Sequence, residues 1–114
     1  MALVLNEEQR LLAETARDFL QKQAPVSALR ALRDSRDPLG YDATLWQQMA
    51  ELGWASVILP EDFGGLDFGF SGLGVVLQES GRTLTASPLF ATAVVGASAL
   101  LLGGSTDQKA EDLP

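Results

Sequence analysis

The sequence predicts an all-α domain, an irregular bundle of about five to six helices. Three observations predict this fold: apolar residues recur at helical spacing, residues that cap helices precede several of these segments, and glycine or proline follows them. The connections are short, and 114 residues can bury a core of their own. We therefore expect residues 1–114 to form one domain.

The first two helices are predicted from caps and a proline. Asn6 and Gln9 have the spacing of a capping box, and the helix that follows should end before Pro25. Ser27 is expected to cap a short second helix over residues 28–33. The inner side of the first helix is predicted to carry Leu12, Ala16, Phe19 and Leu20.

The middle of the chain is predicted to contain one helix, one extended segment and one loop. Asp42 should cap a third helix over residues 43–52, which Gly53 ends in the left-handed conformation. Residues 54–60 are short and apolar and are expected to be extended. Residues 61–69 contain three glycines and predict a sharply bent loop.

The last third of the chain predicts three more helices. Ser71 should cap a fourth helix over residues 72–80, and a fifth is expected near residues 89–102. Ser105 and Gln108 have the spacing of a capping box that opens a sixth helix. The fifth helix is nearly apolar on every side, so we expect part of it to be covered by something outside these residues.

Composition excludes several kinds of chemistry. The chain has no cysteine and no histidine, which excludes thiolate metal sites, a cysteine nucleophile and Ser-His-Asp catalysis, so no metal site is expected. The net charge is −7, and residues 37–114 hold ten acidic groups against two basic ones. A surface of this charge argues against binding to nucleic acid or to the phosphates of coenzyme A.

The uncharged stretch over residues 83–106 is predicted to be a buried helix and its flanks. Its apolar centre, residues 89–102, has fourteen residues and is shorter than the roughly 20 that a membrane span needs. The first residues lack the basic and apolar segments of a signal peptide. We therefore expect no membrane span and a cytoplasmic location.

Other motifs favour structural roles. The glycines between Gly69 and Gly74 follow the order Gly-x-x-Gly-x-Gly, whereas the dinucleotide fingerprint requires Gly-x-Gly-x-x-Gly. Glu79 is expected to be a surface group paired with Arg82 rather than a catalytic base. Trp46 and Trp54 are expected to pack in the core and at its boundary.

One ordered set of motifs is more specific. Residues 51–69 read Glu-Leu-Gly-Trp-Ala-Ser-Val-Ile-Leu-Pro-Glu-Asp-Phe-Gly-Gly-Leu-Asp-Phe-Gly. This run resembles the helix, Leu-Gly-Trp, apolar strand and Pro-Glu-aromatic-Gly-Gly pattern of the acyl-CoA dehydrogenase family. Further segments follow in that family's order: Leu-Asn-Glu-Glu-Gln-Arg-Leu-Leu at 5–12, Leu-Gln-Glu-Ser-Gly-Arg at 77–82, Ser-Pro-Leu-Phe-Ala-Thr at 87–92, and the stretch 102–114, which resembles the end of its N-terminal domain.

The resemblance implies the N-terminal helical domain of an FAD-dependent enzyme of lipid metabolism and fatty-acid β-oxidation. Such enzymes oxidise an acyl-CoA to the 2,3-enoyl-CoA and pass electrons to an electron-transfer flavoprotein. In the family, a middle β-domain and a C-terminal bundle hold most of the flavin and the catalytic glutamate. The resemblance thus implies no catalytic or cofactor-binding residue in this chain, no FAD on this chain alone, and no activity in isolation.

The same resemblance implies that this domain forms a wall of the acyl-chain pocket and an interface with the other domains. The implied wall residues lie on the connection between the fourth and fifth helices and on the fifth helix: Ser87, Pro88, Phe90, Ala91 and Val94. Small Ala91 would leave room for a bulky acyl group.

Two alternatives remain open. Instead of being one domain of a longer enzyme, the chain could be a small non-catalytic subunit, whose partner subunit carries the flavin and the base, or a free-standing helical interaction module. In isolation it is expected to expose apolar surface around Leu73, Val76, Phe90 and Val94, and therefore to self-associate.

Overall fold

The computed structural model describes residues 4–114, and within them the chain is helical with no β-strand. This confirms the predicted all-α bundle. A π-helix, η3, runs directly into α5, and two single-turn 3₁₀ helices, η1 and η2, lie between α3 and α4. The elements in chain order are α1 (Glu7–Gln23), α2 (Val26–Ser35), α3 (Ala43–Glu51), η1 (Trp54–Ser56), η2 (Glu61–Phe63), α4 (Gly69–Arg82), η3 (Phe90–Gly96), α5 (Ala97–Gly103) and α6 (Thr106–Asp112).

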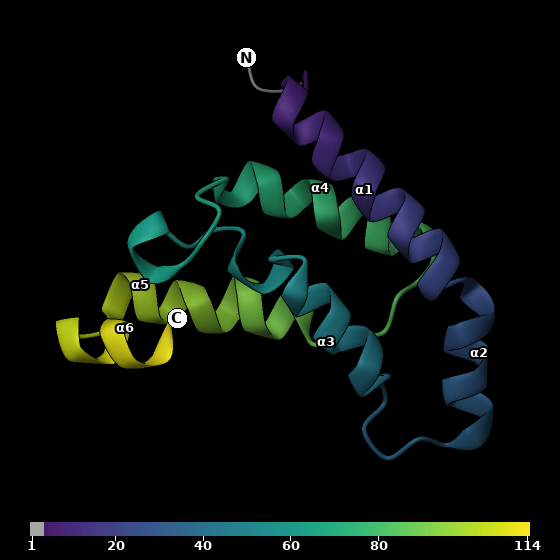
Figure 1. The fold of residues 1–114 in the computed structure, drawn as a ribbon. Helices are drawn as coiled ribbons and strands as arrows, with labels where there is room; N and C mark the ends of the chain where they lie inside the picture. The colour runs from purple at the N-terminus through teal and green to yellow at the C-terminus, as the bar shows by residue number, and fades with distance from the viewer. Residues whose placement is uncertain (1–3) are drawn as a thin grey trace.

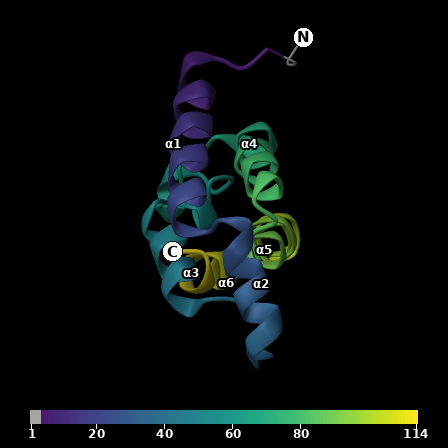
Figure 2. The ribbon, with the colours of Figure 1, turned by 90° about the vertical axis from the view of Figure 1, so that its right-hand side faces the viewer.

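The helices form two crossing groups (Figure 1). Helix α1 packs against α4, and the continuous helix made of η3 and α5 lies below them and contacts η1. Helix α6 folds back against α5 near the C-terminus. Helix α2 stands at the edge of the molecule, at the end opposite the N-terminus (Figure 2), and has no fully buried residue.

The core lies between α1, α3, η1, α4 and the continuous helix made of η3 and α5, which is called the fifth helical run below. Trp54 is 1% exposed, and its ring meets the ring of Phe19 edge to face with centroids 5.4 Å apart. Trp46 packs against this core while partly buried, so both tryptophans have the predicted packing roles. The largest side chains buried with Trp54 are Leu20, Met49, Leu73, Leu89, Val57 and Val76.

The predicted helix caps are confirmed in three places. The Asn6 side chain accepts from Gln9 N at 2.8 Å, and the Gln9 side chain accepts from Asn6 N at 3.1 Å. Asp42 Oδ1 accepts from the backbone of α3, and Ser105 with Gln108 forms the capping box of α6. These bonds satisfy amide groups that a helix start leaves unpaired, which is why the sequence located these ends correctly.

The extended segment predicted at residues 54–60 is wrong. The first turn of this segment is the 3₁₀ helix η1. The later carbonyls accept hydrogen bonds from the loop that follows: Asp67 N donates to Leu59 O at 2.9 Å, and Phe68 N donates to Val57 O at 2.9 Å. The loop therefore provides the hydrogen bonds that a neighbouring strand would have supplied. The backbone at residue 65 passes close to the Leu59 carbonyl, which explains the glycine there, because a Cβ at this position would lie 2.0 Å from Leu59 O.

The predicted starts of α2 and α4 are also wrong. Helix α2 begins at Val26, and its N-cap is Pro25, with an extended backbone and no side-chain hydrogen bond, so Ser27 is not its cap. Helix α4 begins at Gly69, with no side-chain cap, rather than after Ser71.

Two of the four residues expected to be exposed are instead in the core. Leu73 is 1% and Val76 0% exposed, because the apolar side of α4 packs against α1. Phe90 is 60% exposed, as expected, and Val94 is half-buried. Among the described helices, none is both long and apolar enough to cross a membrane.

Candidate functional site

The connection over residues 83–88 carries the first part of the implied pocket wall, and hydrogen bonds define its path. Thr85 N donates to Ser80 O at 3.0 Å, and the hydroxyls of Thr83 and Thr85 are 2.7 Å apart. Leu84 between them has a left-handed backbone with φ of 51°, which is unfavourable for leucine. The turn thus holds a strained residue in place by bonds on both sides.

The fifth helical run begins at the end of this connection. Ser87 Oγ accepts from Leu89 N at 3.3 Å, and Pro88 O accepts from Thr92 N at 2.9 Å. Leu89 is 1% exposed and anchors the run in the core.

The first part of this run is a π-helix rather than an α-helix. The π-helix η3 spans Phe90–Gly96, and at its end Ala97 N donates to Thr92 O, five residues back. A π-turn holds one more residue than an α-turn, so it changes which side chains face outward, and such turns are frequent at functional sites. Gly96 suits this geometry, because a Cβ there would lie 3.3 Å from Ala91 O. Helical periodicity did not predict the π-helix.

The five implied wall residues share one stretch of chain, and most of them are accessible. Phe90 and Ala91 are exposed, while Ser87, Pro88 and Val94 are half-buried. Between them Ala93 is fully buried, so the run has an inner and an outer side. The outer side presents a large aromatic ring next to a small methyl group.

A buried ion cluster lies at the end of α4, just before the connection. Glu79 is 4% exposed, accepts hydrogen bonds from Arg17 at 3.1 and 3.3 Å and forms an ion pair with Arg82 Nε at 2.8 Å. The expected pairing with Arg82 is confirmed, but the expected surface position is wrong because α1 covers Glu79. Hydrogen bonds from Arg17, helped by the charges of both arginines, lower the pKa of Glu79 despite its burial. A carboxylate held ionised in this way is suited to clamping helices rather than to abstracting protons.

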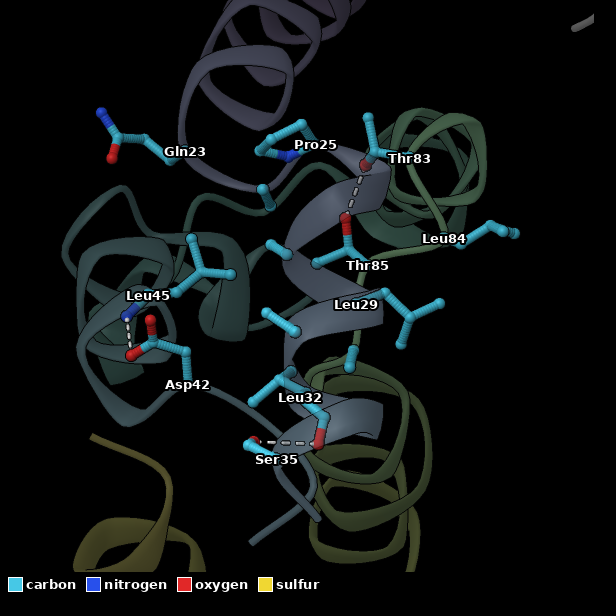
Figure 3. A pocket seen from close by; sticks show the side chains of 14 residues that line it. Gln23, Pro25, Leu29, Leu32, Ser35, Asp42, Leu45, Thr83, Leu84 and Thr85 are labelled. Atoms are coloured by element: carbon cyan, nitrogen blue, oxygen red, sulfur yellow. Dashed lines mark hydrogen bonds between the residues drawn. The ribbon is translucent and has the colours of Figure 1, made fainter. Parts of the chain in front are cut away.

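A pocket of about 320 Å³ lies on the α2 side of the same connection (Figure 3). It is bounded by the end of α1, by α2, by the start of α3 and by residues 83–86. None of the five implied wall residues lines it. The sequence did not predict this pocket, since nothing in the pattern of α2 indicated that a space would remain between the helix and its neighbours.

Residues 37–114 offer few groups that could hold the phosphates of a flavin. A flavin dinucleotide carries a pyrophosphate, yet Arg82 and Lys109 are the basic residues of the acidic part of the chain, and Arg82 is bound to Glu79. Ser98 Oγ is the buried side-chain oxygen without a partner among residues 4–114, and one hydroxyl cannot hold a dinucleotide. No metal-binding cluster of acidic groups occurs in the same residues.

Two known enzymes are similar to this chain in sequence. It is 37% identical over 100 residues to the acyl-CoA dehydrogenase IpdE2 of Mycolicibacterium smegmatis, covering 87% of the chain and 32% of that protein. It is 31% identical over 106 residues to cyclohex-1-ene-1-carbonyl-CoA dehydrogenase of Geobacter metallireducens, covering 92% of the chain and 27% of that protein. The chain thus spans about a third of the length of these relatives or less.

Two solved structures share the fold. A Tcur3481-Tcur3483 steroid ACAD variant superposes with a TM-score of 0.80 at 35% identity, over 90% of this chain and 28% of that one. The ChsE4-ChsE5 complex of Mycobacterium tuberculosis gives a TM-score of 0.81 at 26% identity, over 96% of this chain and 29% of that one. The family described as acyl-CoA dehydrogenase, N-terminal domain, matches residues 6–114. The chain therefore belongs to the acyl-CoA dehydrogenase family, as its N-terminal domain.

Proposed function

We propose that this chain forms one wall of the acyl pocket in an FAD-dependent acyl-CoA dehydrogenase that converts an acyl-CoA to the 2,3-enoyl-CoA. The observation that carries the proposal is the π-helix η3, which exposes Phe90 and Ala91 in a chain that matches the family over residues 6–114. Residues 83–88 lead into that wall and are held by the hydrogen bonds of Thr83 and Thr85.

The acyl group is proposed to be bulky and to contain a ring. Ala91 is exposed and has only a methyl side chain, which leaves room beside the ring of Phe90. Two similar proteins point the same way, since one is named a steroid ACAD and another a cyclohexene-carbonyl-CoA dehydrogenase.

The chemistry itself is proposed to come from outside this chain. Glu79 is the buried carboxylate among the described residues, and it forms ion pairs with Arg17 and Arg82, so it is not free to act as a base. FAD, when bound, accepts the hydride from the substrate. The contribution of these residues is to shape the acyl pocket and exclude water from it, and to present an interface to the parts that hold FAD.

A chimeric enzyme tests the wall directly. This chain would replace the N-terminal domain of a full-length relative, and turnover of acyl-CoAs of increasing size would be followed with an artificial electron acceptor. Ala91→Phe should lower kcat/KM for ring-containing acyl-CoAs about tenfold or more relative to short-chain ones, because the added ring would fill the proposed space. Ala99→Phe, at an exposed position farther along the same run, is the control.

The chimera separates the outcomes. An unchanged size preference in Ala91→Phe, with full FAD content, would exclude the wall assignment while leaving the family intact. A second measurement uses the 114-residue chain itself, mixed with FAD and passed through a sizing column. We expect no visible flavin absorbance in the protein peak. Flavin in a 1:1 ratio with the chain would overturn the proposal that FAD is held outside this chain.

A second candidate function is that of a subunit that joins a different chain. The observation that favours it is that both similar solved structures are named by pairs of proteins, Tcur3481-Tcur3483 and ChsE4-ChsE5. The partner would then carry the flavin and the base. Co-expression with a flavin-containing acyl-CoA dehydrogenase of the same genome should give a yellow complex that elutes as one peak, whereas two separate peaks would exclude that chain as the partner.

A further inference from the structure

We propose that the pocket between α2, α3 and residues 83–86 is a binding site for a compact, uncharged, mostly hydrocarbon molecule with one hydrogen-bond acceptor, such as a ring ketone. The site goes beyond the proposed function, because it contains none of the five wall residues. Its volume of about 320 Å³ lies within the range of small-molecule sites, and is about ten times the space of one water molecule.

Several backbone features hold the walls of this pocket apart. Pro25 fixes the turn between α1 and α2, and the Asp42 cap fixes the start of α3. On the opposite side, the bond from Thr85 N to Ser80 O holds the connection, with Leu84 in its left-handed conformation. Since these constraints lie in the backbone, the pocket is formed before a ligand arrives.

The lining selects an apolar ligand. Its α2 side consists mainly of Ala28, Ala31, Leu29 and Leu32, and small alanines are what leave the space open. Most polar groups of the lining are already engaged within the protein. Ser35 Oγ donates to Leu32 O at 3.2 Å, and Asp42 Oδ1 accepts from two backbone amides.

Besides the side-chain amide of Gln23, the wall offers a hydroxyl donor from Thr83 and Thr85. The hydroxyls of Thr83 and Thr85, 2.7 Å apart, share a single hydrogen bond, and Figure 3 shows them meeting beside α2. Each threonine hydroxyl has one proton, so the hydroxyl that accepts keeps its own proton free. That proton can be donated to a carbonyl or hydroxyl oxygen of a ligand.

The charge of the lining excludes anions. Asp42 is the one ionisable residue of the lining. A carboxylate, phosphate or sulfonate in this pocket would meet the carboxylate of Asp42 and no cation among the lining residues. This distinguishes the pocket from a site for coenzyme A or for a free acid.

Titration of the ¹⁵N-labelled 114-residue chain with camphor, a compact ring ketone, tests the proposal by amide NMR. We expect saturable shifts confined to the lining, with the largest at Ala28, Thr85 and Ala86. Camphor-10-sulfonate has the same ring ketone with an added negative charge, and should bind at least about tenfold more weakly.

Variants locate the site and its donor. Ala28→Phe should fill the pocket and weaken camphor binding about tenfold or more, whereas Ala110→Phe on exposed α6 should change it less than about twofold. Either hydroxyl can be the free donor, so Thr83→Val or Thr85→Val should weaken binding roughly three- to tenfold, and the matching change to serine should restore it. Far-UV circular dichroism confirms that each variant is folded.

Three results would overturn the proposal. One is the absence of saturable shifts with the wild-type chain, and another is camphor binding that Ala28→Phe leaves unchanged. The third is equal affinity for camphor and its sulfonate, which would show that the lining does not select by charge. None of these results bears on the acyl-pocket wall, which the chimera tests separately.

Discussion

Removing the charge of Glu79 tests whether the buried ion cluster joins α1 to α4. Glu79 on α4 accepts two hydrogen bonds from Arg17 on α1 and forms an ion pair with Arg82 one turn later on α4. In Glu79→Gln the side chain keeps its shape, but only one of its two oxygens remains, and its amide nitrogen faces a guanidinium.

The magnitude follows from two charge-assisted hydrogen bonds and one ion pair. Such bonds contribute about 1.5–3 kcal/mol each when shielded from water. Arg17 and Arg82 are 46% and 52% exposed, so solvent screens them, and we take about 1 kcal/mol for each of these interactions. With one of them retained, Glu79→Gln should lower the free energy of unfolding by about 2 kcal/mol.

Urea denaturation followed by far-UV circular dichroism measures this loss. For a slope of about 1.5 kcal/mol per molar urea, the midpoint should fall by about 1.3 M. Glu111→Gln on exposed α6 removes the same charge outside the cluster and should change stability by less than about 0.5 kcal/mol. If the Glu79 variant were as stable as the Glu111 variant, the cluster would contribute nothing to the packing of α1 on α4.

The cluster also predicts how stability depends on pH. The folded pKa of Glu79 lies below its unfolded value of about 4.3, so the stabilisation is complete above the unfolded pKa and is lost as pH falls through the folded pKa. The difference in unfolding free energy between wild type and Glu79→Gln should therefore be constant above about pH 6 and shrink below about pH 4. A difference that grew on acidification would contradict the assigned direction.

The structure makes three further predictions. Gly65→Ala should destabilise the chain by more than about 2 kcal/mol in urea titrations, because the new Cβ would overlap the Leu59 carbonyl; a loss below 0.5 kcal/mol would contradict the close approach. Leu84→Gly should leave stability unchanged or raise it by up to about 1 kcal/mol, since relief of the left-handed strain offsets the added freedom of the unfolded chain; a large loss would mean that the leucine side chain matters more than its backbone. Phe90→Ser combined with Leu102→Ser should reduce self-association in sedimentation experiments, because these side chains are 60% and 88% exposed; an unchanged distribution would exclude that surface.

The helices that the sequence located best are those with a local chemical signal at their start. Asn6, Asp42 and Ser105 each bond to amides two or three residues away, so their effect does not depend on the rest of the fold. Helix α2 lacked such a signal, because the side chain of its N-cap, Pro25, cannot accept a hydrogen bond, and the prediction therefore placed the cap at Ser27.

The sequence predicted only part of the candidate site. The family pattern identified the stretch 87–94, and the structure places its residues along one connection and one helical run. The π-helix was missed because its i to i+5 bonds leave no distinct pattern in an apolar run of small residues. The acyl-wall role of these residues stays a proposal that the chimera tests.

The sequence by itself determined the helical class, most helix ends and the family, because these depend on periodicity, capping and an ordered set of motifs. Tertiary structure alone decided which groups are buried and what they meet. Glu79 seemed a surface residue by its position near a helix end, yet α1 covers it and supplies Arg17 from 62 residues away. The pocket beside α2 likewise exists because three separate segments are held apart, and local sequence carries no information on such distances.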